Sequence, residues 1–301
     1  MTVVLETPSP FAIELPPGRV GLRRAMAAEW TKFWSVRSTM WTLVATGVAV
    51  VGLSALSTGT ISPSDIIDDP TRRSLIGIFL GQLIFGVLGV LVMSAEYGTG
   101  TIRATLSAVP RRPVVLAAKI LVFGAVAVVV SEIFSFVAFA LGQALLSAKH
   151  AVGTGAAISQ HAQQIGLKVP PDIKAQLSSG SASLGQPGVL RAVVGAGLYL
   201  AVLGLMALGL ATIIRHTAGA ISAFVGIVLV LPLIVEALPT SISDAVSRYL
   251  PANIGIVMFS THGVPDRVAS AFSPWTGFGL LVLYTVVILA AGCWVLVRRD
   301  A

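Results

Sequence analysis

Six long apolar runs constrain this chain more than any other feature of its sequence. They cover roughly residues 39–59, 75–95, 114–147, 190–214, 218–238 and 275–297. A run of about 20 apolar residues matches the ~30 Å hydrocarbon core of a bilayer. Inside that core the backbone must satisfy its own hydrogen bonds, so each run predicts a helix; a membrane barrel would need short alternating strands instead. The runs therefore predict an all-α integral membrane protein with six transmembrane helices.

The composition excludes a large soluble core as the explanation of these runs. Of the 301 residues 55% are hydrophobic and only 11% are charged, whereas a soluble domain is about a quarter charged. The net charge of +7 is typical of bases that set topology and meet anionic lipid. We therefore expect membrane lipid, and no nucleic acid, among the partners. Cys293 is the single cysteine, so no intrachain disulfide forms.

Charge around the first run predicts the orientation. The basic segment GLRRAMAAEWTKFWSVRS precedes that run and the acidic SPSDIIDDP follows it. Because bases favour the inner side, and six spans return the chain to its starting side, both termini are expected in the cytoplasm of a multi-pass protein of the cell (cytoplasmic) membrane. Residues 1–18 have no apolar signal core and predict a disordered cytosolic tail. Residues 19–301 then form one membrane domain, with 148–188 as an external loop.

The segment before the first run has the spacing of an amphipathic helix. Its apolar stripe is Leu22, Met26, Trp30, Phe33 and Trp34. The opposite face carries Arg24, Thr31, Lys32 and Ser35, and Arg37 follows. Tryptophan on one face and bases on the other predict a helix lying in the membrane interface. The alternative is one helix continuous with the first span. Glu29 falls near the apolar edge, so the stripe is imperfect.

Two other features concern how the helices pack. The stretch SRYLPANIGIVMFSTHG contains an apolar piece too short to cross a bilayer, which predicts an external re-entrant or surface-lying helix beginning at Pro251. Gly77, Gly81, Gly86 and Gly89 form a small-residue face in the second run, which is typical of helix pairing and favours a dimer.

The polar insert between the second and third runs, EYGTGTIRATLSAVPRR at 96–112, predicts a short helix over 99–109. Thr99 or Thr101 is suited to cap it, Pro110 to end it, and Pro113 to open the third span. Ile102, Leu106 and Val109 share one face, and Arg103 and Ser107 share another. An isolated helix of this length is unstable in water. It therefore needs lipid headgroups or a partner protein to pack on.

The sequence carries no recognisable enzyme site. It has no phosphate-binding G-x-x-x-x-G-K-[ST], no G-x-S-x-G, and four scattered histidines without metal-ligand spacing. We expect no catalysis and no cofactor in this chain. Two acids lie within runs. Glu132 is central in the third run and predicts either a point on a substrate path or a neutral packing contact, whereas Glu236 reaches the interface.

The segment SAEYGTGTIRATLSAVPRRPVVLAAKIL resembles the first cytoplasmic loop of ATP-binding-cassette type-2 exporter permeases. Glu96, Gly100, Thr101, Arg111 and Lys119 fall on positions of that family's loop. AEWTKFWSVRSTMWTL resembles the family's N-terminal interface helix, and YLPANIGIVMF its external segment before the sixth span. The resemblance covers most of the chain except the tail and the 148–188 loop.

This resemblance implies the transmembrane subunit of an exporter that works by alternating access. Such permeases form a homodimer or pair with a second permease, and they sit on separate ATPase subunits that hold ATP and Mg. The loop helix would be the coupling helix that docks into the ATPase. The residues implied in coupling are Glu96, Gly100, Thr101, Ile102, Arg103, Leu106, Val109 and Arg111. Two alternatives remain open: a secondary transporter or channel without an ATPase, and a membrane scaffold or sensor subunit.

Overall fold

The computed structural model describes residues 21–60, 69–109, 111–149, 181–262 and 271–298, and every regular element within them is helical. Six stretches of this described part are long and apolar enough to cross a membrane. They are α2 (Arg37–Gly59), α4 (Ile78–Gly98), α6 (Arg112–Lys149), α9 (Val189–Ile214), the series α10 (Thr217–Val225), η3 (Gly226–Val230) and α11 (Leu231–Glu236), and α14 (Pro274–Arg298). The chain is therefore a multi-pass membrane protein. The predicted tail 1–18 and residues 150–180 of the predicted loop lie outside the described residues.

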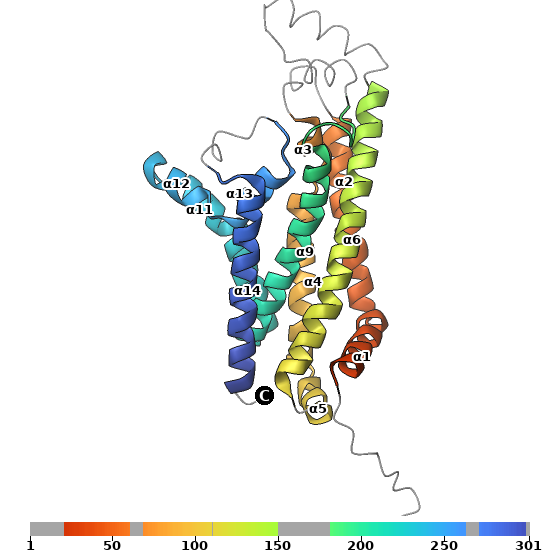
Figure 1. Cartoon of the computed structure of the whole chain (residues 1–301), viewed down its shortest axis with the longest axis vertical. Coiled ribbons are helices and arrows are strands. Elements are labelled where there is room, and N and C mark those ends of the chain that lie inside the picture. Colours follow the sequence, from red (N-terminus) through yellow and green to blue (C-terminus); the bar gives the residue numbers. More distant parts are fainter. Residues whose placement is uncertain (1–20, 61–68, 110, 150–180, 263–270, 299–301) are drawn as a thin grey trace, which may run out of the picture.

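Helix α9 occupies the middle of the bundle. It packs against α4, α6 and α14, and α2 lies on α4 and α6 on the far side from α14 (Figure 1). Its sequence explains this position, because glycine and alanine recur along it and let neighbouring helices approach from several directions. The outward faces of α2 and α14 keep large apolar side chains exposed, such as Trp41 and Val287. These faces suit a hydrocarbon environment.

Shorter helices gather at the two ends of the bundle (Figure 1). Helices α1 (Leu22–Ser35) and α5 (Thr101–Ala108) lie at the end where α14 finishes, here named the α5 end. Helices α3 (Pro70–Ser74) and α13 (Pro251–Phe259) lie at the opposite end, named the α3 end. Helix α13 begins at Pro251, as predicted. The sequence did not predict α3 or α12 (Thr240–Ser247), and α12 leans away from the bundle together with α11.

The glycine face of α4 is used inside the chain, which corrects its assignment to a dimer contact. Gly77 and Gly81 lie against Val50 of α2. A methyl group at Gly86 would lie 2.0 Å from the ring of Phe224, and one at Gly89 would lie 2.2 Å from the carbonyl oxygen of residue 204. These glycines therefore allow α2, α9 and α10 to close on α4.

One buried carboxylate organises the α3 end. Asp69 caps α3 by accepting from the amides of Thr71 at 2.9 Å and Arg72 at 3.3 Å. It also accepts from the hydroxyl of Thr261 at 2.8 Å, the amide of His262 at 3.0 Å and the amide of Thr261. Asp69 thus joins the start of α3 to the segment that follows α13.

Candidate functional site

The site is built around α5, the short helix that connects two spans at the α5 end. Gly100 precedes the helix with φ of +70°, a left-handed conformation that glycine adopts without strain. Neither expected threonine caps the first turn: Thr99 instead donates to the carbonyl of Ala95 at 2.8 Å and lies 2.9 Å from the hydroxyl of Thr101. The observed helix, Thr101–Ala108, lies within the predicted 99–109, and Pro110 lies outside the described residues.

The apolar face of α5 packs on the chain itself, and this corrects the expectation that it awaits a partner. Ile102 and Val109 are buried, and Leu106 is half-buried against the core. Helices α4 and α6 provide the contacting surface. The side chains that remain exposed on this insert are polar, basic or small: Thr99, Thr101, Arg103, Ala104, Ser107, Ala108 and Arg111. Any protein that binds α5 in this conformation meets that second face.

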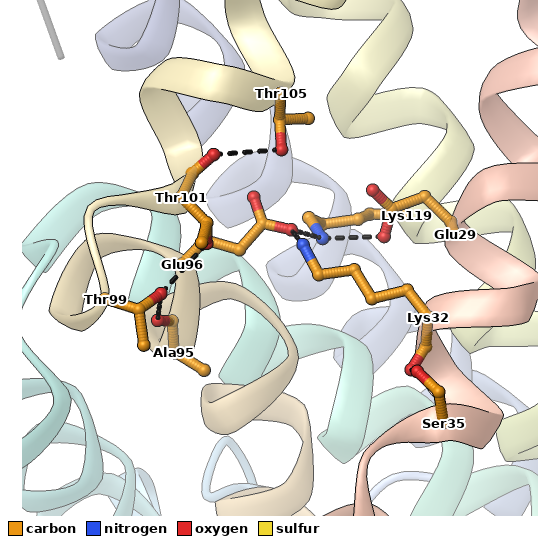
Figure 2. A network of polar contacts seen from close by, with 9 residues as sticks. All are labelled: Glu29, Lys32, Ser35, Ala95, Glu96, Thr99, Thr101, Thr105 and Lys119. Atoms are coloured by element: carbon orange, nitrogen blue, oxygen red, sulfur yellow. Dashed lines mark hydrogen bonds and ion pairs between the residues drawn. The ribbon is translucent and has the colours of Figure 1, made fainter.

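Four charged side chains converge beside α5, from α1, α4 and α6 (Figure 2). We name Glu29, Lys32, Glu96 and Lys119 the charge cluster. The ammonium group of Lys119 lies 2.5 Å from Oε1 of Glu96 and 2.7 Å from Oε2 of Glu29. Lys32 pairs with the same Oε1 of Glu96. Two carboxylates and two ammonium groups make the cluster formally neutral.

Burial makes this cluster a strong positional constraint. The side chains of Lys119 and Glu96 are each only 1% exposed, whereas that of Lys32 is 39% exposed. A buried charge without its partner is costly, so Lys119 and Glu96 must stay together when the helices pack. Glu96 belongs to the last turn of α4, a few residues before α5 starts. The cluster therefore fixes where α5 begins relative to α1 and α6.

Helix α1 is separate from the first span, because Val36 between them has extended backbone angles. Its predicted apolar stripe is divided between two environments. Phe33 is buried, with its ring centroid 6.4 Å from that of Phe123, while Trp30 and Trp34 are exposed and pack edge to face at 5.6 Å. Arg37 is exposed in the first turn of α2. Trp30 and Trp34, but not Phe33, are thus free to meet lipid.

The roles of Glu29 and Lys32 were missed by sequence reasoning. Lys32 was assigned to the outer face of α1 and Glu29 was treated as a flaw in the stripe. The structure turns both toward the bundle, on the side of α1 that also holds Ala25 and Phe33. A signal was present, because residues 25, 29, 32 and 33 have helical spacing. This spacing can be interpreted only when Lys119 and Glu96 are known to lie opposite α1, because they are the counter-charges of Glu29 and Lys32.

At the α5 end, two arginines bind the last turn of α14. Arg112 donates to the carbonyls of Leu296 at 3.0 Å and Val297 at 3.4 Å. Arg215 donates to the carbonyl of Val295 at 3.1 Å. The last carbonyls of a helix have no partner within it, so these guanidinium groups satisfy the end of α14.

The structure separates Glu132 from the other candidate residues. It lies in the middle of α6, where its carboxyl group packs against Gly197 of α9. Lys32, Glu96, Thr101 and Lys119 instead lie close together (Figure 2), and Ile102 belongs to α5 itself. Among the described residues, the candidate positions near α5 therefore form one cluster, and Glu132 lies apart from it within α6.

Comparison with known proteins adds no family assignment. No protein-family model matches the chain, and no curated protein matches it.

Proposed function

We propose that this chain is the transmembrane permease subunit of an ATP-driven exporter, whose ATPase is a separate subunit. The observation that carries the proposal is how α5 is held on the bundle and which of its faces is exposed. This short helix is held on the bundle by its own buried face and by the neighbouring charge cluster, and it presents a basic and hydroxyl-rich face outward. A helix fixed in this way can transmit a push from a bound partner into α4 and α6. The sequence has no P-loop of its own, which agrees with ATP and Mg bound on the partner.

The same proposal assigns sides and surroundings to the helices. The α5 end faces the cytoplasm, with both termini there, and α1 lies along the membrane interface with Trp30 and Trp34 toward lipid. Helix α13 is the external re-entrant helix before the last span. The permease acts as a homodimer or with a paired permease, and Glu132 lies on or beside the path of the substrate.

The partner surface should be acidic. Arg103 and Arg111 are the exposed charges on and next to α5, whereas Glu96 is buried and already paired with lysines. Complementary charge across an interface steers association and fixes register. We therefore expect carboxylates on the ATPase groove that receives α5.

Charge reversal tests this assignment without disturbing the core. Arg103→Glu combined with Arg111→Glu should release the ATPase during purification and abolish stimulated ATP turnover, while the permease still inserts in the membrane. The matched control is Arg23→Glu combined with Arg24→Glu, which reverses two exposed charges of α1 at the same end. Equal loss in both variants would mean that a general basic surface, and not α5, binds the partner.

Flux measurements separate the exporter from its alternatives. Inverted vesicles containing the permease and its copurified ATPase should move substrate only when ATP is supplied. Flux that is independent of ATP would identify a secondary transporter or channel. An ATPase that stays bound without any flux would identify a scaffold or sensor subunit.

A further inference from the structure

Glu132 is held in a recess that a glycine creates. A Cβ atom at Gly197 would lie 2.5 Å from the carboxyl carbon of Glu132 and 2.7 Å from each carboxyl oxygen. Any larger residue at 197 would therefore displace the carboxyl group. The recess lies at the contact between α6 and α9, and we call this contact the α6–α9 seam.

Two serines keep the seam closed around this recess. The hydroxyl of Ser131 donates to the carbonyl of Gly197 at 2.7 Å, and that of Ser135 donates to the carbonyl of Val193 at 2.6 Å. Both serines are fully buried. Their hydroxyl groups are engaged with α9 backbone, so neither donates to Glu132. Separation of α6 from α9 at this point would break both hydrogen bonds.

The carboxyl group itself has no partner among the described residues. Both of its oxygens are buried and neither makes a hydrogen bond. From α9 two backbone groups face the carboxyl group of Glu132. One is the backbone of Gly197, and the other is the amide of Leu198, which lies near the carboxyl group but does not form a hydrogen bond of normal geometry with it. From α6 the facing polar groups are the two engaged serines, and no charged or titratable side chain of the described part interacts with it. A carboxylate in these surroundings would be an uncompensated charge inside a span.

We propose that Glu132 is an intramembrane proton-binding site, which holds a proton while α6 and α9 are packed and releases it when they separate. The neutral acid fits the recess because it needs no counter-charge. Ionisation requires water or a cation at the carboxyl group, and neither reaches it while the seam is closed. Proton release and opening of the seam are therefore linked: each favours the other.

Infrared spectroscopy tests the protonation state directly. The purified full-length protein at neutral pH should show the C=O stretch of a protonated carboxyl group, because water-exposed carboxyl groups are ionised there. Glu132→Gln, which preserves the shape of the side chain, should lose that band. Glu236→Gln removes an exposed acid from the end of another span and should keep it. Absence of the band in the unmodified protein, or its survival in Glu132→Gln, would overturn the proposal.

A second measurement tests the link to seam opening and depends on the proposed function. ATP turnover of the permease–ATPase complex should vary with pH in the unmodified protein and should lose that pH dependence in Glu132→Gln. The pH profile of ATP turnover by the free ATPase serves as the reference, because it gives the pH dependence that belongs to the ATPase alone. Identical profiles for the two permeases would contradict the link. Failure to isolate any ATPase would count against the exporter assignment, while the infrared result would still decide whether Glu132 holds a proton.

Discussion

The ammonium group of Lys119 lies 2.7 Å from the carboxylate of Glu29, which is 90 positions earlier in the chain. This contact joins a helix outside the spans to the longest helix of the bundle, and it is buried almost completely on the lysine side. Lysine is rarely buried unless it is paired. Together with the ion pair between Lys32 and Glu96, this contact anchors α1 to the bundle by charge, beside the buried ring of Phe33.

Removal of Lys119 should destabilise the fold strongly. In Lys119→Met the carboxylates of Glu29 and Glu96 lose their buried counter-charge, and breaking one partner of a buried pair costs about 3–5 kcal/mol. Unfolding of the purified protein in detergent micelles measures this change in the free energy of unfolding. Lys32→Met is the control, because Lys32 is 39% exposed and water can replace it. Equal losses for the two variants would show that Lys119 has no special role.

The two faces of α5 should respond differently to truncation. Ile102→Ala removes a buried side chain and should cost about 2–5 kcal/mol of stability. Ser107→Ala changes the exposed face and should stay within about 0.5 kcal/mol of the unmodified protein. The same detergent unfolding assay compares them. If Ile102→Ala kept full stability but lost a partner, the apolar face would after all be the docking surface.

Glycine-to-alanine substitutions should have opposite signs at two positions in the spans. At Gly86 the added methyl group meets the ring of Phe224, so strain of about 1–3 kcal/mol is expected. At Gly52 nothing lies within 4 Å of the new Cβ, and the helix should gain about 0.5–1 kcal/mol. Unfolding measurements and the oligomeric state from light scattering check both. A Gly86→Ala protein of normal stability but altered oligomeric state would return this face to a dimer contact.

Topology is tested by reporters on the two sides of the membrane. A reporter fused after Arg298 and one inserted within 150–180 should report opposite sides, because an odd number of predicted spans separates them. The C-terminal reporter is expected in the cytoplasm, following the basic flank of the first span. Reports from the same side would contradict the six-span arrangement.

The spans were predictable because their signal is local. Five of the apolar runs coincide with one observed helix each to within a few residues, and the fifth run along the chain coincides with the series α10, η3 and α11. Pro113 and Pro251 lie in the first turn of helices as expected. Short helix α5 was predicted for the same reason, since its glycines, threonines and apolar spacing are read within a dozen residues. Helices α3 and α12 were missed because neither has a long apolar period.

The orientation of side chains was harder to predict because it depends on distant residues. Glu29 and Lys32 face inward only because Lys119 and Glu96 lie opposite them. Ile102 was assigned to a partner because its apolar face suggested a missing cover, and α4 and α6 supply that cover. Amphipathic spacing predicts that the apolar face of a helix is covered, but it does not predict whether the same chain or a partner covers it.

The bonds from Arg112 and Arg215 to the last carbonyls of α14 restrict how that helix can move. A piston-like slide of one helical turn, about 5.4 Å, would break every one of these bonds at once. The last turn of α14 is therefore fixed along its axis to Arg112 at the start of α6 and to Arg215 directly after α9, so an axial displacement of α14 must carry these two neighbours with it.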